Sequence, residues 1–259
     1  MSKFKGVLPL EIPEIVITPK ENISFDISVN EVPWMYCSLN VGDQTIWGIY
    51  DAPEWRLTDC CVTKTLGKAK IHSIDCVQVE LNGYSDPHKA EPDKTHCLYI
   101  HADERLIQYV AASTIEDGVF KMITLYDDDF IENYSIEFGR RVKDAGFGVY
   151  TDGKYNSVNI PLISEQFTIG AGVFDVKIGD RTFECLRVLD RWEKSPRILV
   201  ENYMSREGRS ILFRRYNHPV WKLERYGQRW DEKLPNTNRI YINGEEYVHW
   251  YDCLSDIVF

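Results

Sequence analysis

Apolar and polar residues alternate most clearly along the segment 198–216. Because successive side chains of a strand point to opposite faces, this alternation predicts two antiparallel strands joined by a loop at 206–209. That loop places Glu201 opposite Arg214. A three-residue loop would shift the pairing by one residue and mix apolar with charged side chains on each face. The pattern therefore favours the four-residue loop.

In this predicted register Ser205 faces Ser210, and the two faces of the hairpin differ in character. One face is apolar and carries Ile198, Val200, Met204, Ile211 and Phe213. The other is amphipathic and carries Leu199, Glu201, Tyr203, Leu212, Arg214 and Tyr216. The hairpin is thus expected to pack its first face in the core.

The same alternation, bounded by Gly, Pro and Asp, predicts strands along most of the chain. The predicted segments are 15–17, 23–27, 36–41, 45–50, 57–66, 71–81, 97–101, 106–110 and 119–125. One helix is expected at 127–145, where Phe130, Tyr134, Phe138 and Val142 recur every four residues. The three aspartates at 127–129 suit its N-terminus, and this capping role explains them without a metal ion.

Two segments resemble each other and suggest an internal duplication. Residues 70–79 and 177–188 share Lys-Ile, an apolar residue, an acid, Cys and a final Val, with two extra residues assigned to the turn of the second. Each is followed by a predicted hairpin. We therefore expect a mainly β chain: an antiparallel, strongly curved sheet, or sheets, or a half-barrel built from two similar meanders, with the helix packed on it.

The expected organisation has three parts, with one continuous domain as the alternative. They are an extended arm or edge strands at 1–33, a first meander with the helix at 34–146, and a second meander at 147–259. The strand layout at 168–217 resembles that of the lipoprotein-carrier half-barrels of the bacterial envelope. The resemblance is one of layout, without a shared motif, and no function is carried over from it.

Charge is unevenly distributed in this acidic chain. Its net charge is -10, yet residues 177–240 hold 15 Lys or Arg against 9 Asp or Glu. The overall acidity argues against a nucleic-acid partner, while the local excess of arginine indicates either internal ion pairs or an anion site. The N-terminal residues lack the apolar run of a signal peptide, and no stretch approaches the about 18 apolar residues of a membrane helix. We expect a cytoplasmic protein with no membrane span.

Catalytic and metal-binding signals are weak. The seven cysteines include no C-x-x-C pair, and the chain contains no P-loop, dinucleotide fingerprint or nucleophile elbow. His96 and His101 are five residues apart on one strand and so point to opposite faces. Asp51, Asp59 and Asp75 could supply paired carboxylates, but their spacing selects no pair. No metal site and no cofactor are predicted, and an enzyme is not favoured.

The best candidate surface is the amphipathic face of the hairpin and the residues just beyond it. Arginine beside aromatic rings on a rigid sheet can bind a carboxylate or phosphate while the rings cover an apolar part of the ligand. The alternative is a structural cross-strand pair between Glu201 and Arg214. The candidate ligand-binding residues are Glu201, Tyr203, Arg214, Tyr216, His218 and Trp221.

These observations favour a non-catalytic ligand-binding β protein that holds an anionic or amphiphilic ligand on a concave sheet face. One alternative is an intracellular interaction, immunity or regulatory protein whose acidic surface meets a basic protein partner. Another is a hydrolase or isomerase with His and Asp residues in a β cavity, among them Asp51, His96, His101 and His218.

Overall fold

The fold is seen in a computed structural model of the chain. The described backbone covers residues 4, 6–20, 39–71, 73–102, 106–116, 119–125, 132–133, 141–143, 147–151, 154–158, 165–192, 198–206, 209–218, 239–242 and 244–259. Side chains are described at 4, 6–20, 39–71, 73–101, 110–113, 172–187, 199–206, 209–218, 239–241 and 244–259.

Nearly all of the described chain is β-strand. The strands are β1 Ile15–Lys20, β2 Gln44–Asp51, β3 Arg56–Ile71, β4 Ile74–Tyr84, β5 Lys94–Ala102, β6 Leu106–Glu116, β7 Val119–Leu125, β8 Glu132–Asn133, β9 Arg141–Lys143, β10 Phe147–Thr151, β11 Lys154–Val158, β12 Glu165–Ile178, β13 Arg181–Trp192, β14 Ile198–Met204, β15 Ser210–Asn217, β16 Arg239–Ile242 and β17 Glu245–Ser255. A 3-10 turn, η2 Asp256–Val258, follows β17. The prediction of a mainly β, antiparallel protein is confirmed.

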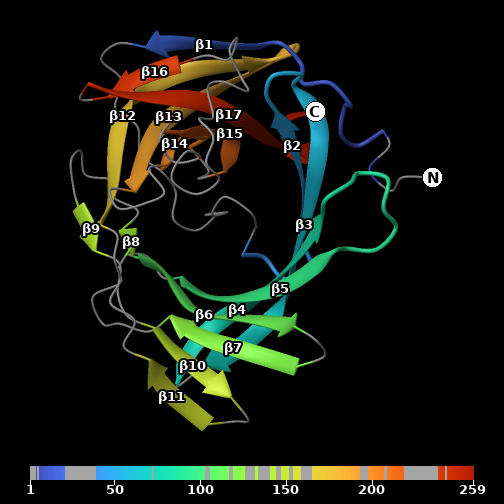
Figure 1. Cartoon of the computed structure of the whole chain (residues 1–259), viewed down its shortest axis with the longest axis vertical. Coiled ribbons are helices and arrows are strands. Elements are labelled where there is room, and N and C mark those ends of the chain that lie inside the picture. The colour runs from blue at the N-terminus through green and yellow to red at the C-terminus, as the bar shows by residue number, and fades with distance from the viewer. Residues whose placement is uncertain are drawn as a thin grey trace.

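The strands form one large antiparallel sheet that is not closed. From neighbour to neighbour its order is β11, β10, β7, β6, β5, β4, β3, β2, β17, β15, β14, β13, β12, β1. The short strands β8, β9 and β16 pair beside β6, β12 and β17. The long strand β3 connects the end of the molecule that holds β12 to β17 with the end that holds β4 to β7 (Figure 1). The C-terminal strand β17 thus lies directly beside the N-terminal strand β2.

The sheet curves strongly between β12 and β3. A single core cluster contains Val176 of β12, Cys185 of β13, Leu212 of β15 and Cys60 of β3, although these strands lie several places apart in the sheet. Their side chains can share one core only if the sheet bends toward that side. The cluster also takes in Phe4 and other N-terminal residues. The concave side is therefore filled by core side chains in this region.

The predicted pairing of Glu201 with Arg214 is confirmed. The tip of the hairpin differs from the prediction. Ser210 pairs with Met204, and the Ser205 N–H donates to the Arg209 carbonyl at 2.8 Å. Ile211 is an extra, bulged residue in β15. The bulge compensates for a loop that is one residue shorter than predicted, so the rest of the hairpin keeps the predicted register. The bulge also turns Ile211 into the cluster that holds Leu212, instead of onto the predicted apolar face.

The two segments that resemble each other both form long hairpins. Ile71 pairs with Ile74 in one, and Ile178 pairs with Arg181 in the other, so both turns have the same length. The two extra residues of the second segment therefore lie in strand β13 and not in the turn. The internal duplication and the three-part division of the chain stay predictions.

The helix predicted at 127–145 is wrong at its described positions. Glu132–Asn133 is strand β8 on β6, and Arg141–Lys143 is strand β9 on β12. Pairing with the edges of long strands outweighs the local helical pattern there, because tertiary contacts override propensity. The remaining residues of that segment, including the three aspartates, lie outside the described residues.

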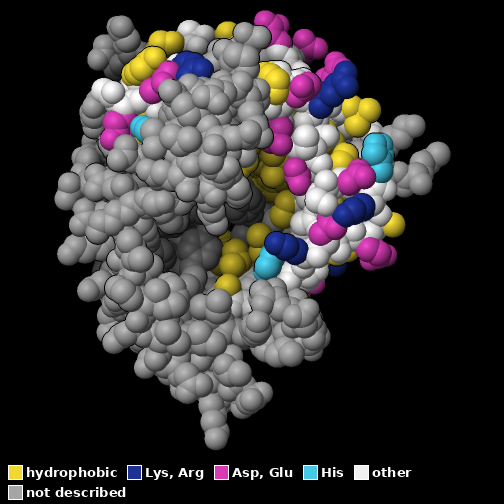
Figure 2. Space-filling view, viewed as in Figure 1, with side chains coloured by type: hydrophobic (Ala, Val, Ile, Leu, Met, Phe, Trp, Pro, Cys, Tyr) yellow, Lys and Arg dark blue, Asp and Glu magenta, His cyan; other side chains and the backbone are white. Residues whose placement is uncertain are grey.

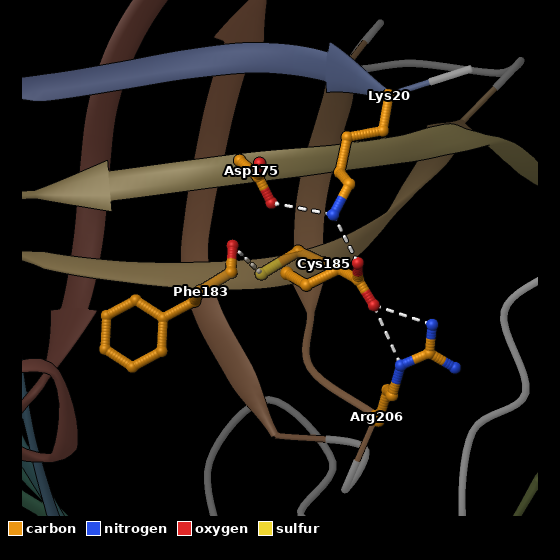
Figure 3. Close-up of polar contacts among 6 residues, drawn as sticks. Lys20, Asp175, Phe183, Cys185 and Arg206 are labelled. Atoms are coloured by element: carbon orange, nitrogen blue, oxygen red, sulfur yellow. Dashed lines mark hydrogen bonds and ion pairs between the residues drawn. The ribbon is translucent and has the colours of Figure 1, made fainter. Parts of the chain in front are cut away.

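An ionic cluster ties β1 and the hairpin tip to β13 (Figure 3). The Glu184 carboxylate lies 2.5 Å from Lys20 Nζ and accepts from Arg206 Nε at 2.9 Å. Lys20 Nζ also lies 3.4 Å from Asp175. These side chains are partly exposed, so we assign the cluster a positioning role and not a large stabilising one.

Candidate functional site

The hairpin presents two faces, which we name after adjacent arginines. The Arg214 face carries Glu201, Tyr203, Leu212, Arg214 and Tyr216. The Arg215 face carries Val200, Asn202, Phe213, Arg215 and Asn217. The Arg214 face contributes Tyr203 and Leu212 to the main core cluster, so it is the concave side. It is also the face predicted to hold the ligand.

The Glu201 carboxylate is buried and fully engaged by the protein. It accepts hydrogen bonds from Tyr216 at 3.0 Å and Tyr203 at 3.5 Å, and it lies 3.5 Å from Arg187 Nη1. Burial, and then the charge of Glu201, raises the pKa of Tyr203 to about 12 and also raises the pKa of Tyr216. Both phenols therefore stay protonated and serve as donors.

Arg214 forms a second buried group with residues of β17. Its Nε and Nη2 donate to the two Asp252 carboxylate oxygens at 3.0 and 3.2 Å. His249 Nε2 lies 2.7 Å from Asp252, and the His249 ring stacks on Tyr216 and contacts the tilted ring of Trp55. Burial alone would raise the pKa of Asp252, but Arg214 and His249 outweigh it and lower that pKa.

The structure therefore gathers four of the predicted site residues but engages their charges within the protein. Glu201, Tyr203 and Tyr216 are buried, and Arg214 is half-buried on the same face. Glu201 and Arg214 are register partners, yet Glu201 is matched by Arg187 and Arg214 by Asp252. His218 is half-buried with its ring against Tyr247, at 5.9 Å between centroids. Trp221 lies outside the described residues.

The Arg215 face has unused hydrogen-bonding capacity. Asn217 is 0% exposed, and neither its amide nitrogen nor its amide oxygen has a partner in the described part of the chain. Two residues away on the same strand face, the Arg215 guanidinium lies over the rings of Trp250 and Tyr251, at 4.8 and 5.8 Å. Its Nε also lacks a partner. Buried polar groups are nearly always paired in folded proteins, so these atoms mark an unusual place in the sheet.

An apolar cluster adjoins these polar groups. Val200 and Phe213 of the Arg215 face pack with Trp47 and Cys253, and Ile49, Cys61 and Tyr251 border them. Figure 2 shows the molecule hollowed near its centre, with hydrophobic side chains on the described part of the wall. The face combines an arginine, an amide and aromatic rings with an apolar floor, which is the composition of a small-molecule site.

Sequence reasoning placed the candidate ligand site on the Arg214 face, and this placement stays a prediction. The unpartnered Asn217 amide and Arg215 Nε lie on the other face. The Asp252 and His249 side chains come from β17, whose position beside β15 no local pattern specifies. A usable signal did exist for the other face. The alternation places Arg215 on the same hairpin face as the apolar residues Val200 and Phe213. A charged side chain on an otherwise apolar face indicates a special role, because charged residues are rarely buried without a partner.

Within the described ranges, no three His, Cys, Asp or Glu side chains gather closely enough to hold a metal ion. All six described cysteines are free thiols. None of the described helical segments is long and apolar enough to cross a membrane.

No family model and no curated protein matches the chain. A solved structure from Bacteroides fragilis NCTC 9343, a protein with a YmcC-like fold, is similar at a TM-score of 0.42 and 11% identity. The likeness covers 84% of this chain and 95% of that one. At this level neither a function nor a site is transferred.

Proposed function

We propose that the chain is a non-catalytic ligand-binding β protein that holds an amphiphilic ligand with an anionic group on the Arg215 face. The observation that carries the proposal is Asn217, whose buried amide has both atoms unpartnered. Burying an unpaired polar group costs about 1–3 kcal/mol, so a sequence that keeps one gains something from it. A ligand carboxylate or phosphate would accept from the amide nitrogen.

The neighbours of Asn217 suit the two ends of such a ligand. Arg215 offers a cation that lies against aromatic rings, and its Nε has no hydrogen-bond partner among the described residues. Arginine recognises carboxylate and phosphate groups through paired donors. The apolar cluster around Phe213 and Trp47 would take the hydrocarbon part. The concave side, where we expected the ligand, is filled by the core, so the proposal moves to the opposite face.

Intrinsic tryptophan fluorescence and thermal melting test this function. We would titrate the protein with dodecanoate and with dodecyl maltoside, each below its critical micelle concentration. Dodecanoate is expected to perturb the fluorescence saturably and raise the melting temperature, because a ligand that binds only the folded state stabilises it. The neutral detergent should bind more weakly.

Two variants make the test specific. Arg215→Gln should weaken dodecanoate binding, whereas the control Arg56→Gln should not, because Arg56 is exposed and lies 3.6 Å from the Glu11 carboxylate. Equal effects of the two variants would contradict the proposal. The acidic-surface interaction protein, the hydrolase or isomerase and the cytoplasmic location stay predictions.

A further inference from the structure

Three side chains form a row across the sheet on the Arg215 face. Arg215 of β15 pairs with Tyr251 of β17, and Tyr251 pairs with Asp51 of β2. Paired residues of antiparallel strands project to the same side. Adjacent strands lie about 4.8 Å apart, so a cation and an anion stand about 10 Å apart at the backbone with a tyrosine between them.

Asp51 has a negative charge that no described cation matches. The carboxylate is half-buried, and no ion pair joins it to any described Lys, Arg or His. Arg56, its register partner on β3, instead contacts Glu11. Burial, and then the nearby Asp59, raises the pKa of Asp51, while a hydrogen bond with the Thr58 side chain acts in the opposite direction. A partly desolvated carboxylate beside a second one is typical of a site that receives a cation.

The Arg214 face provides a comparison, because it holds an ion pair between adjacent strands to which we assign only a structural role. There, Arg214 and Asp252 are register partners on adjacent strands and meet through two hydrogen bonds. On the Arg215 face the opposite charges are separated by a whole strand. Asn217, with its unpartnered buried amide, stands beside the cationic end of the row and points independently to a ligand there.

We propose that the Arg215–Tyr251–Asp51 row binds a zwitterionic headgroup. Its anionic group lies at Arg215 and Asn217, and its cationic group lies at Asp51 beside Asp59. The cation relieves the repulsion between the two carboxylates, and the apolar cluster at Phe213 receives the tail. This inference rests on the proposed function and narrows its ligand to amphiphiles that carry both charges.

A series of ligands with one tail and different headgroups tests the inference. Binding of dodecylphosphocholine, dodecanoate, dodecyltrimethylammonium and dodecyl maltoside is measured below each critical micelle concentration. Dodecylphosphocholine is expected to bind ~10- to 100-fold more tightly than dodecanoate, because its trimethylammonium group adds an ionic contact with the partly buried Asp51 carboxylate. Dodecyltrimethylammonium should bind weakly, because Arg215 opposes it.

Variants of the acidic end separate this inference from the proposed function. Asp51→Asn should reduce dodecylphosphocholine affinity to about that of dodecanoate and leave dodecanoate binding unchanged. The matched control is Asp75→Asn, an exposed aspartate paired with Lys70 on the far hairpin. Circular dichroism verifies folding, and Asp59→Asn provides a second variant that should act in the same direction.

Each pattern of results decides one of the two ideas. Equal binding of dodecanoate and dodecylphosphocholine, unaffected by Asp51→Asn, would overturn the zwitterion inference and leave the anionic ligand site in place. Binding of none of the four amphiphiles would overturn both.

Discussion

Arg214 and Asp252 face each other across β15 and β17 through two hydrogen bonds, with the Asp252 side chain 3% exposed and that of Arg214 17% exposed. Such a pair contributes little when intact but is costly to break, because removal of one partner leaves a buried charge unmatched. We therefore expect Asp252→Asn to lower the free energy of unfolding by about 3–5 kcal/mol in urea titrations. The exposed control Arg56→Gln should change it by less than about 1 kcal/mol.

The same pair predicts a pH dependence. The pKa of Asp252 in the folded chain is below its ordinary value of 3.8, so the charged form stabilises the fold. This contribution is complete above the unfolded pKa and is lost as the pH falls through the folded one. The stability difference between the parent and Asp252→Asn should therefore be constant near neutrality and shrink below about pH 4. A difference that grew on acidification would contradict the assignment.

Gly48 occupies a position in β2 where a side chain has no room. A Cβ there would lie 2.7 Å from Leu57 Cδ1 and 3.0 Å from Leu8 Cδ1, both in the core. Gly48→Ala should cost about 1–3 kcal/mol through overpacking. Gly67→Ala is the control, since a Cβ there meets nothing within 4 Å. Chemical denaturation of both variants checks the difference, which should vanish if the contact with Leu8 and Leu57 is unimportant.

Asn217→Leu should stabilise the protein while abolishing ligand binding. The leucine removes two buried polar atoms that have no partner, a gain of about 1–3 kcal/mol. Asn202→Leu provides the contrast, because the Asn202 oxygen accepts from Ser210 Oγ at 2.6 Å. That variant leaves a buried hydroxyl unpaired and should destabilise. If both variants shifted the melting temperature in the same direction, the assignment of Asn217 as unpartnered and Asn202 as partnered would be wrong.

We expect Glu184 to hold β1 against β13 through ionic contacts that weaken as the salt concentration rises. Glu184→Gln weakens the attraction for Lys20 and Arg206, so limited proteolysis near β1 should become faster at low ionic strength. Because screening shortens the range of these interactions, the difference from the parent should fade in about 1 M NaCl. A difference that persisted at high salt would point to packing instead of charge.

Local alternation was sufficient to predict the mainly β, antiparallel class and the Glu201–Arg214 register. The strand predicted at 36–41 is wrong at residues 39–41, which form a bend and a turn, and the strand predicted at 23–27 lies outside the described residues. Alternation could not predict the Ile211 bulge, because a bulge changes the count on one strand without changing the order of apolar and polar residues. The helical pattern at 127–145 failed for a related reason. The residues at Arg141–Lys143 pair with the distant strand β12, and a local pattern contains no information about that partner.

The candidate site was predictable only in part. The sequence pointed to the hairpin and to arginine beside aromatic residues, and these are present on both faces. The charges on the Arg214 face are matched by residues of other strands. Asp252 of β17 pairs with Arg214, and Arg187 of β13 pairs with Glu201. Those strands become neighbours of the hairpin through the topology of the whole sheet, which no window of sequence reveals.

The pairing of β17 with β2 has a consequence for synthesis on the ribosome. Residue 251 pairs with residue 51, so β2 must wait for nearly the whole chain before its second neighbour arrives. Until then the β2 edge offers unpaired backbone groups to other nascent chains. Long-range strand pairing of this kind is slow and exposes chains to aggregation. Expression of this protein should therefore benefit from slow translation at low temperature and from chaperones that shield strand edges.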